Sequence, residues 1–348
     1  MEASKPEGIS LCMIVRDEEF FIQHMLASAR EYVDEVILVD TGSVDNTVEI
    51  ARPLVDRLEF FSWVDDFAAA RNYSLQFAKF RWILVLDADE VIAPQDYERL
   101  RELMSDSDRD GYYLIQRQYS DNADGADSQW IPVAINDEYA GDFRGYRENR
   151  ILRFFRNNKD ICYRGRIHEI VDYSLDSDRI GSTDIPIHHH HSNPDWGTRD
   201  HAMRDLAIME QIIAEGAATG REYSLAGAVH LRVTGNYSAA IDYLTHALAL
   251  GEKPISTREA IAEAHYRAGN LSEAITEYRT LYALGATSSA IKNNLSNLLV
   301  RTGELGEAAD LLEEILDEGV SDPVRKARIE GNLMALRGEI ERQRKEKS

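Results

Sequence analysis

The sequence predicts an α/β domain followed by an all-α domain of helical repeats. Over residues 9–91, short apolar runs alternate with segments of helical character, as they do where strands and helices alternate along a chain. From Pro194 onward the pattern is helical almost throughout, and glycines recur there 34 residues apart. Because 348 residues suit two domains of ~150 residues each, we expect an α/β domain at 1–193 and a repeat domain at 194–348.

Four apolar runs in the first domain are typical of buried strands. They lie at residues 9–15, 35–39, 58–63 and 82–86. The segments between them, at 20–32, 47–55 and 67–80, have the composition of helices. Strands that are apolar along their whole length and separated by helices predict a parallel sheet that is covered on both faces.

The helical pattern fades between residues 111 and 187. Runs of aromatic and β-branched residues at 112–115, 151–155 and 167–171 predict further strands that complete the domain. The segment 120–147 is polar and rich in Gly and Asp. Such a length indicates either a lid or binding loop, or a disordered segment.

The repeats in the second domain have a period of 34 residues. Three kinds of position recur at this spacing: a turn glycine, a small residue five positions later and a large apolar residue nine positions later. They are Gly235, Gly269 and Gly303; Ala240, Ala274 and Ala308; and Leu244, Tyr278 and Leu312. This period is the tetratricopeptide signature. Because each repeat buries its apolar face only against its neighbours, we expect a curved solenoid.

Composition excludes several classes of partner. The formal net charge of -22 disfavours nucleic acid, whose binding needs clustered Lys and Arg, and disfavours adhesion to anionic lipid by charge alone. No apolar run approaches the ~20 residues of a membrane span, and residues 1–8 lack a signal core. The two cysteines, Cys12 and Cys162, form no CxxC pair, which argues against a disulfide framework. We therefore expect a cytoplasmic protein.

Two aspartates follow the fourth strand, and their position predicts a cation site. Asp87 and Asp89 come directly after the apolar run at 82–86. Ligands of open parallel sheets bind beyond the carboxyl ends of the strands. Two carboxylates there concentrate negative charge, which a divalent cation bound to diphosphate oxygens neutralises. The alternative is a pair of ordinary turn aspartates.

Two further motifs lie at the same predicted edge. Asp40 ends the second strand and begins the turn Asp-Thr-Gly-Ser, where its carboxylate is able to accept hydrogen bonds from a nucleoside, or where Asp45 simply caps the next helix. Arg71 lies on the following helix, and its fork of N–H groups suits a phosphate or a uracil edge. An ion pair with Asp65 or Asp66 is the alternative for Arg71.

These segments together resemble glycosyltransferases of family 2, with the Rossmann-like GT-A fold, in the branch fused to tetratricopeptide repeats. The likeness rests on four segments that occur in this order: SLCMIVRDEE, VILVDTGSVDNTVEIA, DDFAAARN and WILVLDADE. It is close over residues 9–91 and looser over 150–188. The resemblance implies an inverting transferase that uses a nucleotide-sugar donor, UDP-linked in our prediction, with Mn²⁺ or Mg²⁺.

The resemblance also implies roles for single residues at the donor site. Val15, at the end of the first strand, and Asp40 would hold the nucleoside, with help from Arg71. Asp87 and Ala88 would hold the ribose, and Asp89 would bind the metal on the diphosphate.

Two later clusters complete the predicted site. Arg164 to Glu169 resembles an Arg-x-His-Glu element near the acceptor, so Glu169 is the predicted base and His168 is predicted to line the sugar site. A salt bridge from Glu169 to Arg164 or Arg166 is the alternative, and the Glu-Asp pair that often supplies the base in this family is not evident. His188 matches the first His of an HYGY-like element and is predicted as a metal ligand, although the Tyr-Gly-Tyr part is absent. A packing or linker role is the alternative for His188.

Three readings of the function remain open at this point. The leading one is the metal-dependent transferase, with a peptide or protein acceptor suggested by the repeats, as in bacteriocin-peptide S-glycosyltransferases. A saccharide acceptor, as in lipopolysaccharide-core enzymes, is the alternative, and homodimerisation is the rival use of the repeats. A phosphatase would carry the paired aspartates after its first strand rather than its fourth. A catalytically inactive repeat adaptor would not need Asp40, Arg71, Asp87 and Asp89 intact.

Overall fold

The computed structural model describes residues 5–121, 130–134, 137–189, 199–320 and 322–346. The chain divides into two compact units, Met1–Trp196 and Gly197–Ser348, and each is described by itself. The boundary predicted between residues 193 and 194, and the histidines at 190 and 191, lie outside the described residues.

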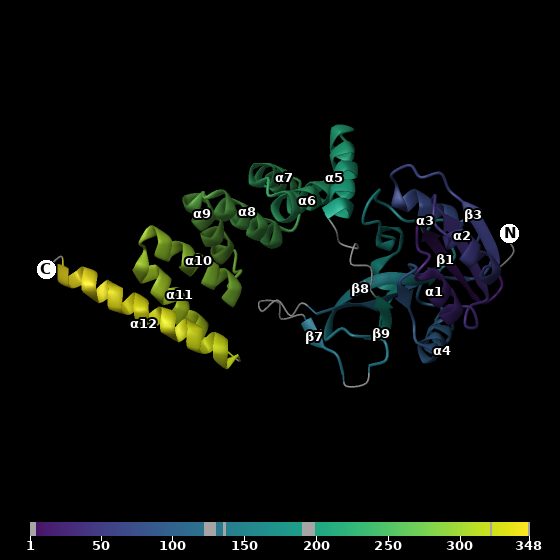
Figure 1. Cartoon of the computed structure of the whole chain (residues 1–348), viewed down its shortest axis with the longest axis horizontal. Helices are drawn as coiled ribbons and strands as arrows, with labels where there is room; N and C mark the ends of the chain where they lie inside the picture. The colour runs from purple at the N-terminus through teal and green to yellow at the C-terminus, as the bar shows by residue number, and fades with distance from the viewer. Residues whose placement is uncertain (1–4, 122–129, 135–136, 190–198, 321, 347–348) are drawn as a thin grey trace. The chain divides into compact units, whose positions relative to one another are not determined.

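The first unit is built on one mixed sheet (Figure 1). Its strands are β1 (Ile9–Val15), β2 (Glu35–Asp40), β3 (Arg57–Phe60), β4 (Trp82–Val85), β5 (Glu90–Val91), β6 (Gly111–Ser120), β7 (Trp130–Pro132), β8 (Gly145–Arg156) and β9 (Ile180–His189). They lie in the order β3-β2-β1-β4-β8-β6-β9-β5, with β7 on β8. The first four strands are parallel, as predicted, whereas β8 joins β4 in antiparallel orientation. This is the Rossmann-like GT-A architecture.

Helices and loops cover both faces of the parallel half. The helices are α1 (Ile22–Ala29), α2 (Thr47–Ala51), α3 (Phe67–Leu75) and α4 (Pro94–Leu103). Leu11 and Met13 of β1 point into a core with α1, α2 and α4. Cys12 between them points the other way, into a core with α3. Because side chains alternate along a strand, an apolar run such as β1 supplies both cores.

Several elements differ from the sequence-based prediction. Residues 167–171 do not form a strand, because only an isolated bridge joins Arg164 and Ile170. The prediction missed β9, which contains Gly181 and Pro186, two residues that normally interrupt strands. It also missed α4, whose exposed face is so charged that little apolar pattern remains. The segment 120–147, predicted as loop, contains β7 and the start of β8.

The second unit is entirely helical. Its elements are α5 (Arg199–Ala214), α6 (Gly220–Val229), a π-helical turn (His230–Thr234), α7 (Tyr237–Ala249), α8 (Pro254–Ala268), α9 (Leu271–Ala283), α10 (Ser289–Thr302), α11 (Leu305–Asp317) and α12 (Pro323–Glu346). Gly235, Gly269 and Gly303 end helical segments with φ of +70°, +84° and +86°, which confirms the predicted turns. The alanines at the predicted crossings are fully buried. None of the described helices combines the length and apolarity that a membrane crossing requires.

Candidate functional site

Two loops at the carboxyl end of the parallel strands are joined side by side. Ser43 Oγ accepts a hydrogen bond from the Asp17 backbone N–H at 3.0 Å, and Asp17 Oδ1 accepts one from the Val44 N–H at 2.7 Å. Similar bonds link Glu19 to Asp45 and Asn46. The loop after β1 therefore holds the loop after β2 in one arrangement.

Asp40 organises this pair of loops. Its Oδ1 accepts hydrogen bonds from the N–H groups of Gly42 at 3.0 Å and Ser43 at 3.1 Å, and its side chain is buried. The Val15 carbonyl oxygen also takes part in a turn hydrogen bond, because it accepts from the Thr41 N–H at 2.9 Å. Both residues end their strands where the sequence predicted, and their hydrogen bonds shape the turn after β2.

Strained backbone gathers in the same region. Within the described residues, the non-glycine positions with positive φ are Asp17 (+57°), Asp65 (+56°) and His168 (+50°). Asp17 follows β1, and Asp65 precedes α3. His168 belongs to a loop that docks on the start of α3, since the Arg166 carbonyl accepts from the Phe67 N–H at 2.9 Å. Backbone strain of this kind costs energy and concentrates at functional sites.

Asp87 is held between two arginines. Its Oδ1 accepts from Arg71 Nη2 at 2.8 Å, and its Oδ2 accepts from Arg153 Nη2 at 2.7 Å. Desolvation raises the pKa of Asp87, but the charges of Arg153 and Arg71 outweigh it and hold that pKa well below its usual range. Asp87 is therefore an anion at every physiological pH. The following residue, Ala88, is buried in the turn.

Arg71 connects Asp87 to the predicted base. Its Nε donates to Glu169 Oε1 at 2.5 Å, a pairing that neither of the alternative ion pairs for Arg71 and Glu169 included. The next residue, Asn72, exchanges two hydrogen bonds with the Tyr163 backbone. The helix α3 therefore anchors the loop 163–169 and brings Glu169 to the same edge as Asp87.

Asp89 faces a histidine, but not the one that was predicted. His189 Nε2 lies 3.0 Å from Asp89 Oδ2, and both side chains are almost fully buried. His188 points to the other side of β9, where its Nδ1 lies 2.7 Å from the Tyr119 hydroxyl and its ring stacks on Tyr139 with centroids 4.0 Å apart. Because neighbouring residues of a strand face opposite sides, the structure brings His189 and not His188 to Asp89.

Glu18 is a site residue that the sequence reasoning missed. Burial, followed by the charges of Asp89 and Asp87, raises the pKa of Glu18 to about 8. Glu18 belongs to the loop after β1, but the negative charges of the aspartates after β4 contribute to its raised pKa. The acidic run Asp17-Glu18-Glu19 directly after a buried strand was the available signal.

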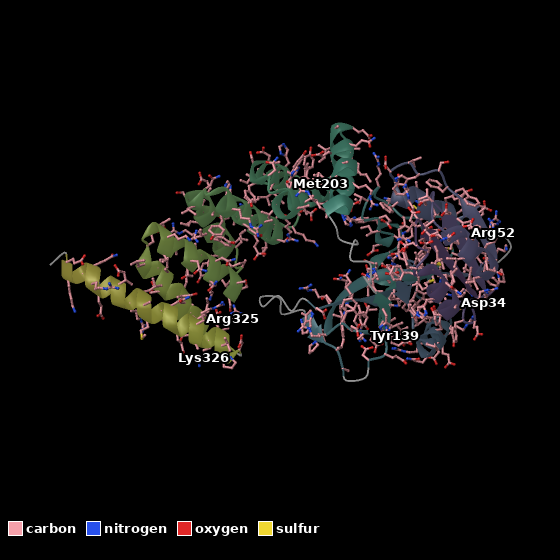
Figure 2. All side chains as sticks on the ribbon, viewed as in Figure 1. Asp34, Arg52, Tyr139, Met203, Arg325 and Lys326 are labelled. Carbon is pink, nitrogen blue, oxygen red and sulfur yellow. The ribbon has the colours of Figure 1, made fainter. Side chains whose placement is uncertain are left out.

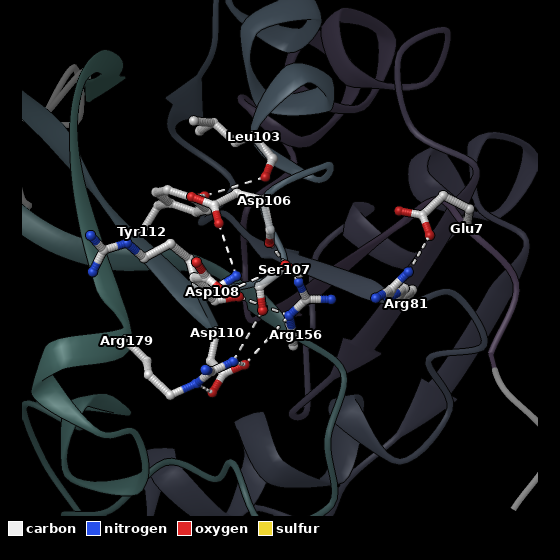
Figure 3. Close-up of polar contacts among 11 residues, drawn as sticks. Glu7, Arg81, Leu103, Asp106, Ser107, Asp108, Asp110, Tyr112, Arg156 and Arg179 are labelled. Atoms are coloured by element: carbon white, nitrogen blue, oxygen red, sulfur yellow. Dashed lines mark hydrogen bonds and ion pairs between the residues drawn. The ribbon is translucent and has the colours of Figure 1, made fainter.

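A separate polar cluster lies at the opposite end of the parallel strands, where β4 begins. Figure 3 shows Arg179 paired with Asp110, beside Arg156. A cavity of about 440 Å³ there is lined by Glu7, Arg81, Arg101, Met104, Ser105, Ser107 and Arg156. Each of its three arginines already contacts a carboxylate. We assign this cluster to the stability of the sheet, because ligands of such sheets bind at the other end of the strands.

Solved structures with partial likeness to the chain include two that contain bound ligands. One is S. aureus TarS 1-349 in complex with UDP-GlcNAc, with 15% identity, coverage of 80% of this chain and 92% of that chain, and a TM-score of 0.40. The other is glucosyl-3-phosphoglycerate synthase from Mycobacterium tuberculosis in complex with Mn²⁺, UDP and glucosyl-3-phosphoglycerate, with 17% identity, coverage of 62% and 82%, and a TM-score of 0.40. At these scores neither likeness supports a conclusion about ligands.

Sequence comparisons place both units in known families. The model for "Glycosyl transferase family 2" matches residues 10–168, and that for the tetratricopeptide repeat matches 225–289 and 259–323. A TPR repeat-containing protein of Synechococcus elongatus is 30% identical over 320 residues, which cover 87% of this chain and 73% of that protein. The glycosyltransferase SunS of Bacillus subtilis is 24% identical over 219 residues, 61% of this chain but 46% of SunS. Residues 10–168 therefore form a domain of glycosyltransferase family 2, and tetratricopeptide repeats follow it in the chain.

Proposed function

We propose that the chain is a metal-dependent inverting glycosyltransferase that moves a sugar from a UDP-sugar to a peptide or protein side chain. The observation that carries the proposal is the pair Asp89 and His189 at the carboxyl end of β4, beside the turn that Asp40 shapes. The choice of UDP rests on the likeness of the motifs at 9–91 to the family. The test is release of UDP from nucleotide sugars by the purified chain, with and without Mn²⁺.

The side chains of Asp89 and His189 suit a divalent cation that is bound by the protein and the diphosphate together. A carboxylate oxygen of Asp89 and an imidazole nitrogen of His189 lie 3.0 Å apart. Within the described residues no three His, Cys, Asp or Glu side chains are already arranged as a metal site. Such ions often take only one or two carboxylates from the protein and the rest of their ligands from phosphate. The bound ion would act as a Lewis acid on the departing diphosphate.

Glu169 is our proposed base for the acceptor. Arg71 Nε, at 2.5 Å, keeps its carboxylate oriented, and only 12% of its side chain is exposed. An ionised carboxylate beside the incoming hydroxyl or thiol takes its proton as the bond to the sugar forms on the face opposite the leaving diphosphate. His168, with its strained backbone, precedes Glu169 and is proposed to line the sugar site.

The repeat unit offers a place for an extended acceptor. A groove of about 790 Å³ is lined mainly by α8 and α10. Asn294 and Asn297 line it, and side-chain amides both donate and accept hydrogen bonds as peptide groups do. The Arg301 guanidinium, which also lines the groove, lies over the Tyr266 ring at 5.2 Å from its centroid. These polar contacts support a peptide acceptor; dimerisation through the repeats remains the rival proposal.

The first expected result concerns Asp40. Replacing it with Ala removes the acceptor for the Gly42 and Ser43 N–H groups and loosens the turn. We expect calorimetry with UDP and Mn²⁺ to show a loss of ~1–3 kcal/mol, the usual cost of stranding buried polar partners. Asp40→Asn, which keeps an acceptor oxygen, should lose less. Equal UDP affinity in the wild type and the Ala variant would contradict the assignment.

The second expected result concerns Arg301. Arg301→Ala should raise KM for a peptide acceptor about tenfold, because an arginine held on an aromatic ring is a typical binding hot spot. The acceptor is taken from a random peptide library by transfer of labelled sugar. Arg325→Ala on α12, outside the groove, is the matched control (Figure 2). An unchanged KM for Arg301→Ala would exclude this groove as the acceptor site.

A further inference from the structure

The two aspartates after β4 have different surroundings. Asp87 has both carboxylate oxygens on guanidinium groups, one from Arg71 and one from Arg153. Among the described residues, Asp89 pairs with no arginine and instead has its Oδ2 3.0 Å from His189 Nε2. The two arginine side chains are each 7% exposed, whereas that of Asp87 is 32% exposed. The same motif therefore contains one carboxylate that is paired with two arginines and one that is paired with a histidine.

Arg153 contacts both end residues of the turn 87–90. It lies on β8, which is antiparallel to β4 and pairs Phe154 with Leu84. Its Nη2 also lies 3.6 Å from Oε1 of the fully buried Glu90. Glu90 Oε2 in turn accepts from the Asp87 backbone N–H at 2.8 Å. Side chain and main chain of Asp87 are thus both tied to the Arg153–Glu90 pair.

The turn between these anchors carries Asp89. The Glu90 N–H donates to the Asp87 carbonyl at 3.1 Å, which closes the turn. Gln116 of β6 donates to Glu90 Oε1 at 2.5 Å and holds it from the far side. With both ends held, Asp89 has little freedom, and its carboxylate stays against His189 on β9. Catalytic groups need such support to remain in productive geometry.

We propose that Arg153 is a positioning residue for sugar transfer, and that Asp87 serves as its anchor rather than as a ligand of the nucleotide or the cation. Arg153 holds Asp87, and the turn then presents Asp89. This inference rests on the proposed function, because it concerns the same site. It also replaces the ribose contact that the motif predicted for Asp87.

The proposal makes a distinctive prediction about paired substitutions. Removing either member of a buried ion pair removes the contact that the pair makes, so removing the second member adds little further loss. Arg153→Met and Asp87→Asn should each lower kcat for UDP-sugar hydrolysis by about 100-fold. The double variant Arg153→Met with Asp87→Asn should lose about as much kcat as either single variant, and Arg153→Lys should retain more activity than Arg153→Met. A ligand role for Asp87 that is independent of Arg153 predicts that the two losses multiply.

The measurements are kcat and KM for hydrolysis of UDP-glucose and UDP-GlcNAc, and Mn²⁺ affinity in the presence of UDP by electron paramagnetic resonance. Arg179→Met, at the opposite edge of the sheet, is the matched control (Figure 3). A melting curve accompanies each variant. A folded double variant whose loss of kcat equals the product of the two single losses, or an Arg153→Met variant with wild-type kcat and Mn²⁺ affinity, would overturn the proposal.

Failure of the proposed function is separable from failure of this inference. If the wild type binds no Mn²⁺–UDP and hydrolyses no UDP-sugar, the proposed function is wrong. The pairing of Arg153 with Asp87 is then tested by the thermal stability of the variants alone. Each single variant should lower Tm, and the double variant should lie above the sum of the two shifts. Strictly additive shifts would overturn the pairing as well.

Discussion

Asp89→Asn is expected to abolish most transfer while leaving the fold intact. Asn keeps an oxygen for the hydrogen bond with His189 but removes the anionic ligand. Because a bound Lewis acid contributes several kcal/mol to the stabilisation of a departing diphosphate, we expect a loss on the order of 100-fold or more in kcat. The measurement is sugar transfer and UDP release over a Mn²⁺ titration.

Asp184→Asn is the matched control for this variant, since Asp184 is an exposed aspartate on the same strand as His189. It should behave as the wild type. An Asp89→Asn variant that is fully active in the presence of a chelator would exclude the metal-dependent mechanism.

Truncation after Trp196 is expected to separate donor chemistry from acceptor transfer. The first unit contains all of the proposed donor-site residues and has its own apolar cores. The groove with Arg301 lies wholly in the second unit. The shortened chain should therefore keep slow Mn²⁺-dependent hydrolysis of the nucleotide sugar and lose transfer to a peptide. Both reactions are measured on the same preparation.

Circular dichroism and a melting curve must show that the shortened chain is folded. Loss of both reactions in an unfolded preparation would report only on stability. A folded, shortened chain that glycosylates its peptide acceptor at the full rate would show that the repeats serve another purpose, most simply dimerisation.

Part of the site could be predicted from the sequence because its motifs are contiguous. The first four strands, the turn after Asp40 and the carboxylates after β4 are local features, because strand ends and turns depend on neighbouring residues. The repeat glycines were readable for the same reason. A second series, Gly251, Gly285 and Gly319, has the same 34-residue spacing and positive φ, and the same search would have found it.

Side-chain pairings between segments that are distant in the sequence could not be predicted. Arg153 lies 66 residues from Asp87, and Glu169 lies 98 residues from Arg71. β8 carries four arginines, and nothing in its sequence marks Arg153 as the partner of an aspartate elsewhere in the chain. The choice between His188 and His189 depended on the register of β9, where His189 lies opposite Glu90. Strand register is set by the assembled sheet, so four consecutive histidines leave it undetermined.

The most direct test of the central claim is hydrolysis of nucleotide sugars without an acceptor. The full chain is incubated with a panel of UDP-, GDP- and TDP-sugars, with Mn²⁺ or with EDTA, and the released nucleotide is quantified. We expect slow release of UDP from at least one UDP-sugar, dependent on Mn²⁺ and lost in Asp89→Asn. Absence of release from every donor by a folded chain, or release that is equal in EDTA, would contradict it.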